Sequence, residues 1–278
     1  MARPRVRLVI TADDFGYCPR RDEGIVEAFL AGAVTSVSLL VNGVAAESAA
    51  ELAGRHQIPT GLHANLSEGR PVGPARHGAS SLLSPEGFFL GKMGFREAVA
   101  AGDIALPQVR EELEAQLIRF RELLGGEPTH VDGHQHVHVL PGVCQVFAET
   151  LQANGVRFTR LPVERGVGGC AWLEAPAHAF ACAVERDARA AVGPFSRYGL
   201  RGRSKEVLQA YSNFSRRNSL LQKWDPGLLT RPGDVCVPCH CGSCVLDQGD
   251  AGSSWEHRAL PHSGVWKGRL NNDLVSPS

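Results

Sequence analysis

The stretch that decides the fold is Val6-Arg7-Leu8-Val9-Ile10-Thr11-Ala12-Asp13-Asp14-Phe15-Gly16, where a β-branched run leads directly into two carboxylates and a glycine. The first six residues are typical of a buried strand. The spacing of apolar residues predicts a helix over Asp22 to Leu30, ending at Gly32. A strand that ends in polar residues and is followed by a helix is the repeating unit of parallel α/β proteins, so the stretch points to that class.

The same alternation continues to about residue 200. Further strands are predicted over Ser36–Val41, Thr60–Leu66, Val131–Val139 and Arg157–Leu161, and helices over Ala45–Leu52, Val109–Leu124, Val143–Leu151 and Ala175–Val192. Strands and helices at this spacing predict βαβ units and a parallel sheet or barrel. We therefore expect an α/β chain with either a parallel sheet or a barrel, and a binding or lid loop over Ser67 to Gly94.

The composition changes after Arg201. Residues 202–278 contain many Ser, Gly, Pro, Asn and Trp breaks and few periodic apolar runs. We predict an α/β domain over residues 1–201 and a poorly ordered tail over residues 202–278 that adds no further strand. The barrel would then be incomplete at its C-terminal end.

Composition and charge exclude several classes of protein. The 278 residues are 43% hydrophobic and 21% charged, so a core is expected and wholesale disorder is not. Twenty-nine basic residues balance 29 acidic ones, and no overall field attracts nucleic acid or anionic lipid. Apolar runs such as Val37 to Val41 are far shorter than the roughly 20 residues that span a bilayer. No signal-peptide core follows Met1, so we expect an intracellular, cytoplasmic protein without a nucleic-acid or membrane partner.

The carboxylates Asp13 and Asp14 are adjacent, and adjacent strand residues point to opposite faces. A turn before Gly16 would let one carboxylate bind a metal while the other accepts a proton from water. A solvated acidic turn is the alternative, and the pair alone does not decide between them.

Histidines supply the other candidate ligands. His63 shares a strand face with Asn65, and one segment carries alternating polar residues of the same parity: His130, Asp132, His134, His136 and His138. One Asp and two His from separate strand ends would form a three-ligand divalent site with open positions for water. Residues on one face advance by about 6.6 Å, so only one can meet an ion without bending. If His134 is that residue, we expect neither His136 nor His138 to be a ligand, and His130 to be deeper or structural.

Four motifs together resemble the YdjC family of metal-dependent carbohydrate deacetylases, which includes the chitooligosaccharide deacetylases. They are Val9 to Gly16, Val34-Thr35-Ser36 with Val41-Asn42-Gly43, Gly61-Leu62-His63-Ala64-Asn65, and Pro128 to His138. The motifs occur in order at the expected strand ends, and the resemblance covers residues 1–201.

The resemblance implies a (β/α)-barrel-like fold related to the TIM barrel. It also implies hydrolysis of N-acetyl groups on chitooligosaccharide-type amino sugars. By position, Asp14, His63 and His134 match the metal ligands and Asp13 matches the catalytic base, while Asn42 and Asn65 are expected to contact the oligosaccharide substrate. Magnesium is the metal that the resemblance implies. Two imidazoles and one carboxylate would also suit zinc.

The sequence departs from the family pattern after Arg201. Family members carry a later His-Pro pair whose histidine is suited to protonate the leaving amine, whereas here Pro261 precedes His262, and His240 lies in unrelated surroundings. Loss of such an acid costs about 10²–10⁴ in rate, so the chain is expected to bind a divalent metal and turn over poorly. A relative that keeps metal or sugar binding without catalysis is the alternative.

The cysteines suggest a third possibility. Cys18, Cys144, Cys170 and Cys182 are scattered like reduced thiols, but the other four crowd into nine residues: Cys236, Cys239, Cys241 and Cys244. Two C-x-x-C knuckles could hold zinc in an interaction module. They are separated by a single residue where zinc folds leave about a dozen or more, which favours incidental thiols.

Overall fold

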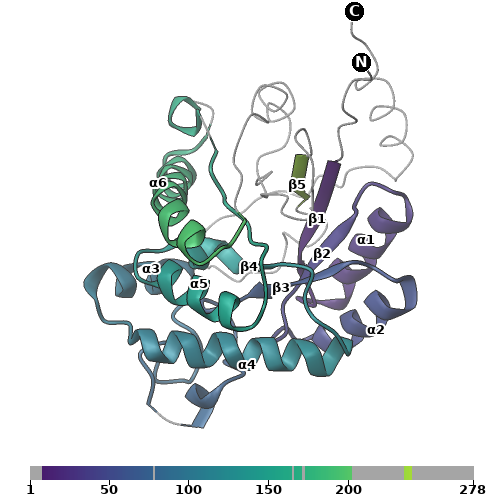
Figure 1. Cartoon of the computed structure of the whole chain (residues 1–278), viewed down its shortest axis with the longest axis horizontal. Helices are drawn as coiled ribbons and strands as arrows, with labels where there is room; N and C mark the ends of the chain where they lie inside the picture. The colour runs from purple at the N-terminus through teal and green to yellow at the C-terminus, as the bar shows by residue number, and fades with distance from the viewer. Residues whose placement is uncertain (1–7, 78, 165, 171–172, 202–234, 240–278) are drawn as a thin grey trace, which may run out of the picture. The chain divides into compact units, whose positions relative to one another are not determined.

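In the part of the chain that the structure describes, five parallel strands form one sheet in the order β4-β3-β2-β1-β5 (Figure 1). A computed structural model of the chain describes residues 8–77, 79–164, 166–170, 173–201 and 235–239. The strands are β1 (Leu8–Phe15), β2 (Ser36–Leu39), β3 (Thr60–Ala64), β4 (Val131–Gly133) and β5 (Val235–Cys239). Because all five run the same way, the carboxyl ends of β1 to β4, with the candidate ligands, lie along one edge.

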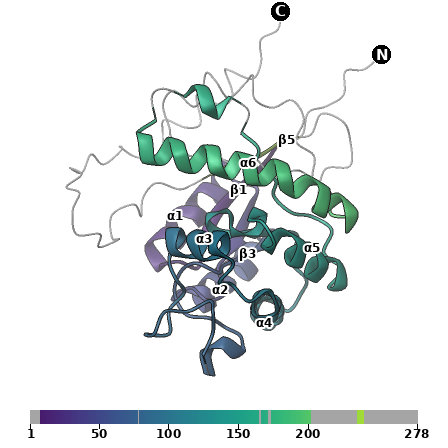
Figure 2. The same cartoon turned by 90° about the vertical axis from the view of Figure 1, so that its left-hand side faces the viewer.

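Within the described residues, six α-helices connect and cover the sheet. They are α1 (Pro19–Leu30), α2 (Ala46–His56), α3 (Lys92–Ala101), α4 (Leu106–Leu124), α5 (Val143–Ala153) and α6 (Ala175–Arg197). Successive members of this layer touch: α1 contacts α2, α2 contacts α4, α4 contacts α5, and α5 contacts α6. Figure 2 shows α4 end-on and α6 along its length. The parallel sheet and the helices that cover it confirm the predicted α/β class, while the barrel-like arrangement stays a prediction.

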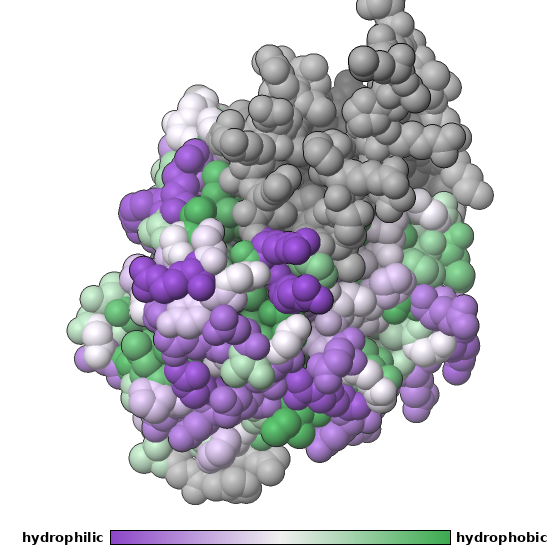
Figure 3. All heavy atoms as spheres, viewed as in Figure 1, coloured by the Kyte–Doolittle hydropathy of each residue, from purple (hydrophilic) through white to green (hydrophobic). Residues whose placement is uncertain are grey.

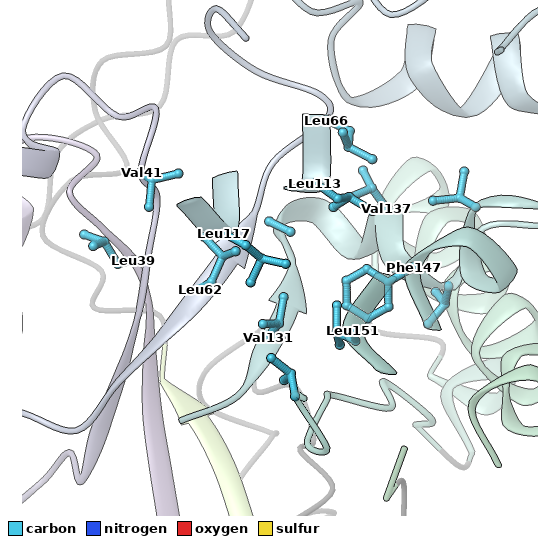
Figure 4. Close-up of a cluster of buried hydrophobic side chains, with 14 of the residues drawn as sticks. Leu39, Val41, Leu62, Leu66, Leu113, Leu117, Val131, Val137, Phe147 and Leu151 are labelled. Carbon is cyan, nitrogen blue, oxygen red and sulfur yellow. The ribbon is translucent and has the colours of Figure 1, made fainter. Parts of the chain in front are cut away.

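The core lies between the sheet and the helices α4 and α5 (Figure 4). The predicted apolar stripe of α4 is confirmed, since Val109, Leu113, Leu117 and Phe120 are buried and Leu124 is partly buried. Buried strand residues such as Leu62 and Val131 belong to the same cluster, together with Phe147 and Leu151 of α5. On the face seen in Figure 3, hydrophilic residues are interspersed with smaller groups of hydrophobic ones over the described part.

The fourth strand is shorter than predicted. It ends at Gly133, and residues His134–Val139 form a 3₁₀ segment in which Gln135 and His136 have positive φ angles of 51° and 63°. The His138 ring folds back over Gly133, where an added Cβ would lie 2.5 Å from its Nδ1 atom. The prediction that the histidines share one strand face is therefore wrong beyond Gly133.

The predicted strand over Arg157–Leu161 is also wrong. This segment makes only an isolated bridge between Phe158 and Arg201, and the Phe158 carbonyl accepts a hydrogen bond from Val131 N–H at 3.0 Å. The Arg160 carbonyl, which a neighbouring strand would bind, instead lies 3.0 Å from Nε2 of the His138 ring. A side chain thus takes the place of a ladder hydrogen bond.

The tail contributes one strand, so the prediction that it adds none is wrong. Strand β5 pairs with β1 from Leu8 opposite Val235 to Ala12 opposite Cys239. The sequence predicted no strand because breaker residues recur in the tail, and Pro238 within β5 is one of them. Proline is tolerated on an edge strand, and β5 ends the sheet order. The chain divides into two units, Met1–Gly242 and Ser243–Ser278, and all described residues belong to the first.

Other features refine the sequence analysis. The helix α3 begins inside the loop predicted over Ser67 to Gly94, and that loop also contains a 3₁₀ turn at Pro74–His77. Among the described helices, none combines the length and the apolar character that a bilayer crossing requires.

Candidate metal centre

A β-bulge at the end of β1 turns the adjacent carboxylates of Asp13 and Asp14 toward His63. Ala12 lies opposite Val37 and Phe15 opposite Leu39. Between these two pairs β1 therefore contains one more residue than β2, which is a β-bulge. Asp14 within this bulge has a φ angle of +61°, a left-handed conformation that aspartate tolerates better than most residues. Bulges re-aim side chains beside functional sites, and this one removes the usual alternation of faces.

Asp14, His63 and His134 converge as the sequence predicts. The Oδ1 atom of Asp14 lies 3.4 Å from Nε2 of His63 and 3.0 Å from Nδ1 of His134. One ligand atom from each of the three residues lies within 4.8 Å of the other two, which is close enough for a single ion to bind all three. The three residues come from β1, from β3 and from the segment after β4.

A second group of possible ligands consists of Asp13, His63 and Asp132, whose ligand atoms also lie within 4.8 Å of one another. In this group a guanidinium lies between the two carboxylates. The guanidinium of Arg160, whose side chain has no exposed surface, pairs with Asp13 and lies 2.7 Å from Asp132 Oδ2. A cation already occupies the space between these carboxylates. The first group is therefore the better candidate for a metal ion.

The charge of the cluster also suits a divalent cation. Direct contacts join four carboxylates and two guanidinium groups: Asp13, Asp14, Glu68, Asp132, Arg21 and Arg160. With neutral histidines these groups carry two negative charges in excess. Burial of this excess is costly unless a cation balances it.

The pKa values of the ligands reflect this excess. Burial opposes a charge on His63, but the carboxylates of Asp132 and Asp13 outweigh burial and raise the pKa of the imidazole to about 10. Burial would raise the pKa of Asp14, yet hydrogen bonds from His134 and His63 hold that pKa well below its usual range. Protons and a divalent cation therefore compete for the same imidazole nitrogens.

A buried carboxylate orients His63. The Nδ1 atom of His63 donates to Asp132 Oδ1 at 2.6 Å, so its Nε2 atom faces Asp14. Ser38 Oγ donates to Asp132 Oδ2 at 3.3 Å. A carboxylate behind a ligating histidine fixes the tautomer and raises the basicity of the ligand nitrogen.

The remaining histidines of this segment have structural contacts. His130 is buried and lies 2.9 Å from both Ser38 Oγ and Thr129 Oγ1. The His138 ring stacks on Phe195, with ring centroids 6.2 Å apart, and the His136 ring lies 6.3 Å from that of Phe180. His130, His136 and His138 belong to neither candidate ligand group, and their exclusion as ligands stays a prediction.

Asn42 and Asn65 hold a loop at the mouth of the site. The Asn65 amide donates to Asn42 Oδ1 and to the Glu68 carbonyl, while its Oδ1 accepts from the backbone N–H groups of Ser67 and Glu68. The Asn42 amide donates to the carbonyls of Glu68 and Arg70 at 3.0 Å. Contact of Asn42 and Asn65 with a substrate stays a prediction.

Two residues of the site were missed from the sequence. Glu68 lies in a Gly-rich loop with no periodic signal, and its Oε2 atom is 2.9 Å from His134 Nε2. Arg160 lies in the segment interpreted as a strand. The segment also contains Arg157 and Thr159, so the residue pattern gave no signal that singled out Arg160.

Carboxylate and imidazole ligands at the carboxyl edge of a parallel sheet define an α/β protein with a candidate metal centre. The profile of the YdjC-like proteins matches residues 7–265, and the chain belongs to this family. The match extends beyond Arg201, where the sequence analysis expected the family likeness to stop.

Relatives with curated names match a shorter region. The chain is 90% identical to a mouse carbohydrate deacetylase and 89% identical to a human one over 201 residues, which are 72% of this chain. It spans a little under two thirds of these relatives, 65% of the mouse protein and 62% of the human protein. A chitooligosaccharide deacetylase of Serratia marcescens is 39% identical over 150 residues, 54% of this chain and 57% of that protein.

A solved structure shares the fold. It is a putative cellobiose-phosphate cleavage protein from Enterococcus faecalis V583, with a TM-score of 0.51 and 26% sequence identity over 66% of each chain. This likeness agrees with the α/β fold that the sequence predicts.

Substitution of Arg160 by glutamine should strongly destabilise the protein, because two buried carboxylates then lose their cation. We expect Arg160→Gln to lower the free energy of unfolding by about 3–5 kcal/mol, as when one partner of a buried ion pair is removed. Arg189→Gln is the matched control, since Arg189 is 54% exposed and pairs with Glu185 on the surface of α6. The control should lose less than about 1 kcal/mol. Urea unfolding at neutral pH measures both, and equal losses would contradict the bridging role of Arg160.

Asp22 should make stability depend on pH. Its Oδ1 atom accepts a hydrogen bond from Gly16 N–H at 2.7 Å, and burial raises the pKa of this carboxyl to about 7. The ordinary pKa of aspartate is about 3.9, so between these values the folded state holds a proton that the unfolded state has lost. The Asp22 contribution to stability is therefore complete below about pH 4 and is lost as pH rises through about 7.

The variant Asp22→Asn keeps the acceptor for Gly16 and cannot titrate. Urea unfolding at several pH values should show that wild-type stability falls, relative to Asp22→Asn, as pH rises toward about 7. The exposed Glu27 of α1 provides the control Glu27→Gln, which should run parallel to wild type. Parallel curves for wild type and Asp22→Asn would show that burial does not perturb Asp22.

Proposed function

We propose that this chain is a metal-dependent hydrolase that removes N-acetyl groups from acetylated carbohydrates of the chitooligosaccharide type. The observation that carries the proposal is the convergence of Asp14, His63 and His134 beside a second carboxylate, Asp13. The names of the mouse, human and Serratia marcescens relatives support this reaction and this substrate class.

The donor set fits a divalent cation. Two imidazole nitrogens and one carboxylate oxygen leave positions open for water and substrate. We propose magnesium from the family resemblance, with zinc as the alternative that the two imidazoles suit. With both histidines neutral, as ligation requires, the cluster carries two negative charges in excess, which supports a divalent ion of either kind.

A bound divalent cation would polarise the acetyl carbonyl and lower the pKa of an attacking water. Asp13 would accept the proton of that water as general base. Both of its carboxylate oxygens lie against the Arg160 guanidinium, with Oδ2 at 2.6 Å from NH1, so this contact fixes the orientation of the base. Asp132 likewise fixes the His63 ring through its 2.6 Å contact.

The step that releases the amine is expected to be slow. Residues 202–278 contain no His-Pro pair, and residues 202–234 and 240–278 lie outside the described ranges. We propose turnover about 10²–10⁴ lower than that of a relative with such an acid.

We also propose a cytoplasmic location, which the reduced thiols of Cys144, Cys170 and Cys182 support. Zinc binding by the tail stays a prediction: Cys236 and Cys239 belong to β5, and Cys241 and Cys244 lie outside the described residues.

Release of acetate from N-acetylglucosamine oligomers tests the function. We expect slow release that requires added Mg²⁺ or Zn²⁺. Asp13→Asn should lower the rate by a further factor of about 10²–10⁴ while metal binding persists, because the base is lost and the three ligands remain. Thermal unfolding shows whether this variant, which also removes a charge opposite the buried Arg160, is folded. Asp14→Asn should weaken metal binding as well. Glu47→Gln on α2 is the control, since its carboxylate is exposed and pairs with Arg119.

Two results would separate the alternatives. Metal binding by wild type without any metal-dependent acetate release would favour the non-catalytic relative. An equal rate for wild type and Asp13→Asn would remove the assignment of Asp13 as base.

A further inference from the structure

The His134 ring lies between two carboxylates. Its Nδ1 atom is 3.0 Å from Asp14 Oδ1, and its Nε2 atom is 2.9 Å from Glu68 Oε2. The imidazole is buried, and the Glu68 side chain is 25% exposed. Because a neutral imidazole carries one proton, a hydrogen bond from Nε2 to Glu68 leaves Nδ1 as the nitrogen with a free lone pair.

Glu68 is held at both ends. Its Oε1 atom accepts a hydrogen bond from Nε2 of Gln135, the residue that follows His134, at 2.6 Å. Its backbone N–H donates to Asn65 Oδ1 at 3.0 Å, and its carbonyl accepts from the amides of Asn65 and Asn42. The carboxylate is therefore a fixed acceptor and not a freely rotating surface group.

Both histidines have one ring nitrogen near Asp14 and the other hydrogen-bonded to a second carboxylate, but the roles of Nδ1 and Nε2 are exchanged between them. His63 presents Nε2 to Asp14 and donates from Nδ1 to Asp132, whereas His134 presents Nδ1 to Asp14 and donates from Nε2 to Glu68. Each imidazole thus has a carboxylate behind it. Asp132 belongs to a buried strand, while Glu68 belongs to a loop.

We propose that Glu68 is the positioning residue of the metal centre: it fixes His134 with Nδ1 turned toward Asp14 and His63. The inference rests on the metal site of the proposed function and assigns a role to a loop residue outside the ligand set. The loop is itself anchored, since Phe89 N–H donates to the Gly69 carbonyl and Gly91 N–H to the Ser67 carbonyl, both at 2.9 Å. The backbone of this loop therefore determines the direction of a ligand nitrogen.

Calorimetric titration of the full chain with Zn²⁺ alone tests the proposal. Glu68→Ala should weaken binding about 10- to 100-fold, the usual effect of removing a carboxylate behind a ligating histidine. Glu68→Gln should lose less, because the amide oxygen still accepts from Nε2. Glu86→Gln is the control, since Glu86 is exposed and lies on the same loop excursion. Thermal unfolding without metal shows whether each variant is folded.

The ¹⁵N resonances of the imidazoles give a readout that a general loss of stability would not move. In the Zn²⁺-loaded wild type, His134 should carry its proton on Nε2 and bind through Nδ1. In Glu68→Ala the His134 signal should shift toward a mixture of tautomers, while His63 keeps the pattern that Asp132 imposes.

The outcomes separate this inference from the proposed function. Wild-type affinity in Glu68→Ala, with binding lost in His134→Ala, would overturn the role of Glu68 and leave the metal centre standing. Zn²⁺ binding unaffected by His134→Ala would overturn the metal centre and the inference together.

Discussion

The contact of the Arg160 guanidinium with Asp13 and Asp132 is the interaction on which the rest of the site depends. It brings together carboxylates from β1 and β4, which stand at different positions in the sheet order. Asp132 in turn orients His63, and Asp13 stands beside Asp14. Without the Arg160 guanidinium at this place, no arginine would balance the charges of the two buried carboxylates Asp13 and Asp132, and burial of unbalanced charges is among the costliest events in folding.

The bulge in β1 lets two adjacent carboxylates, Asp13 and Asp14, reach different partners in the same site. Adjacent residues of a regular strand cannot both face one centre, yet Asp13 must reach Arg160 while Asp14 reaches the two histidines. The extra residue and the left-handed φ of Asp14 meet both demands at the cost of local backbone strain. The same device recurs after β4, where left-handed Gln135 and His136 turn the chain so that His134 and Gln135 both meet Glu68.

The sequence predicted the features that follow from residue periodicity. Strand and helix alternation predicted the α/β class, and the positions of Asp14, His63 and His134 after strands predicted their convergence. It could not predict β4 correctly, because parity along a strand assumes that the strand continues, and nothing in Gln135 or His136 signals positive φ. Glu68 and Arg160 were missed because their roles arise from tertiary contacts, and β5 because breaker residues recur in the tail, Pro238 within β5 among them.

Anomalous diffraction from crystals grown with Zn²⁺ tests the central claim most directly, because it locates the ion without reference to activity. The account predicts one strong peak at about 2.0–2.2 Å from an Asp14 oxygen, His63 Nε2 and His134 Nδ1. A peak at Cys236, Cys239, Cys241 and Cys244 alone, or on the group of Asp13, His63 and Asp132 in place of Arg160, would contradict it.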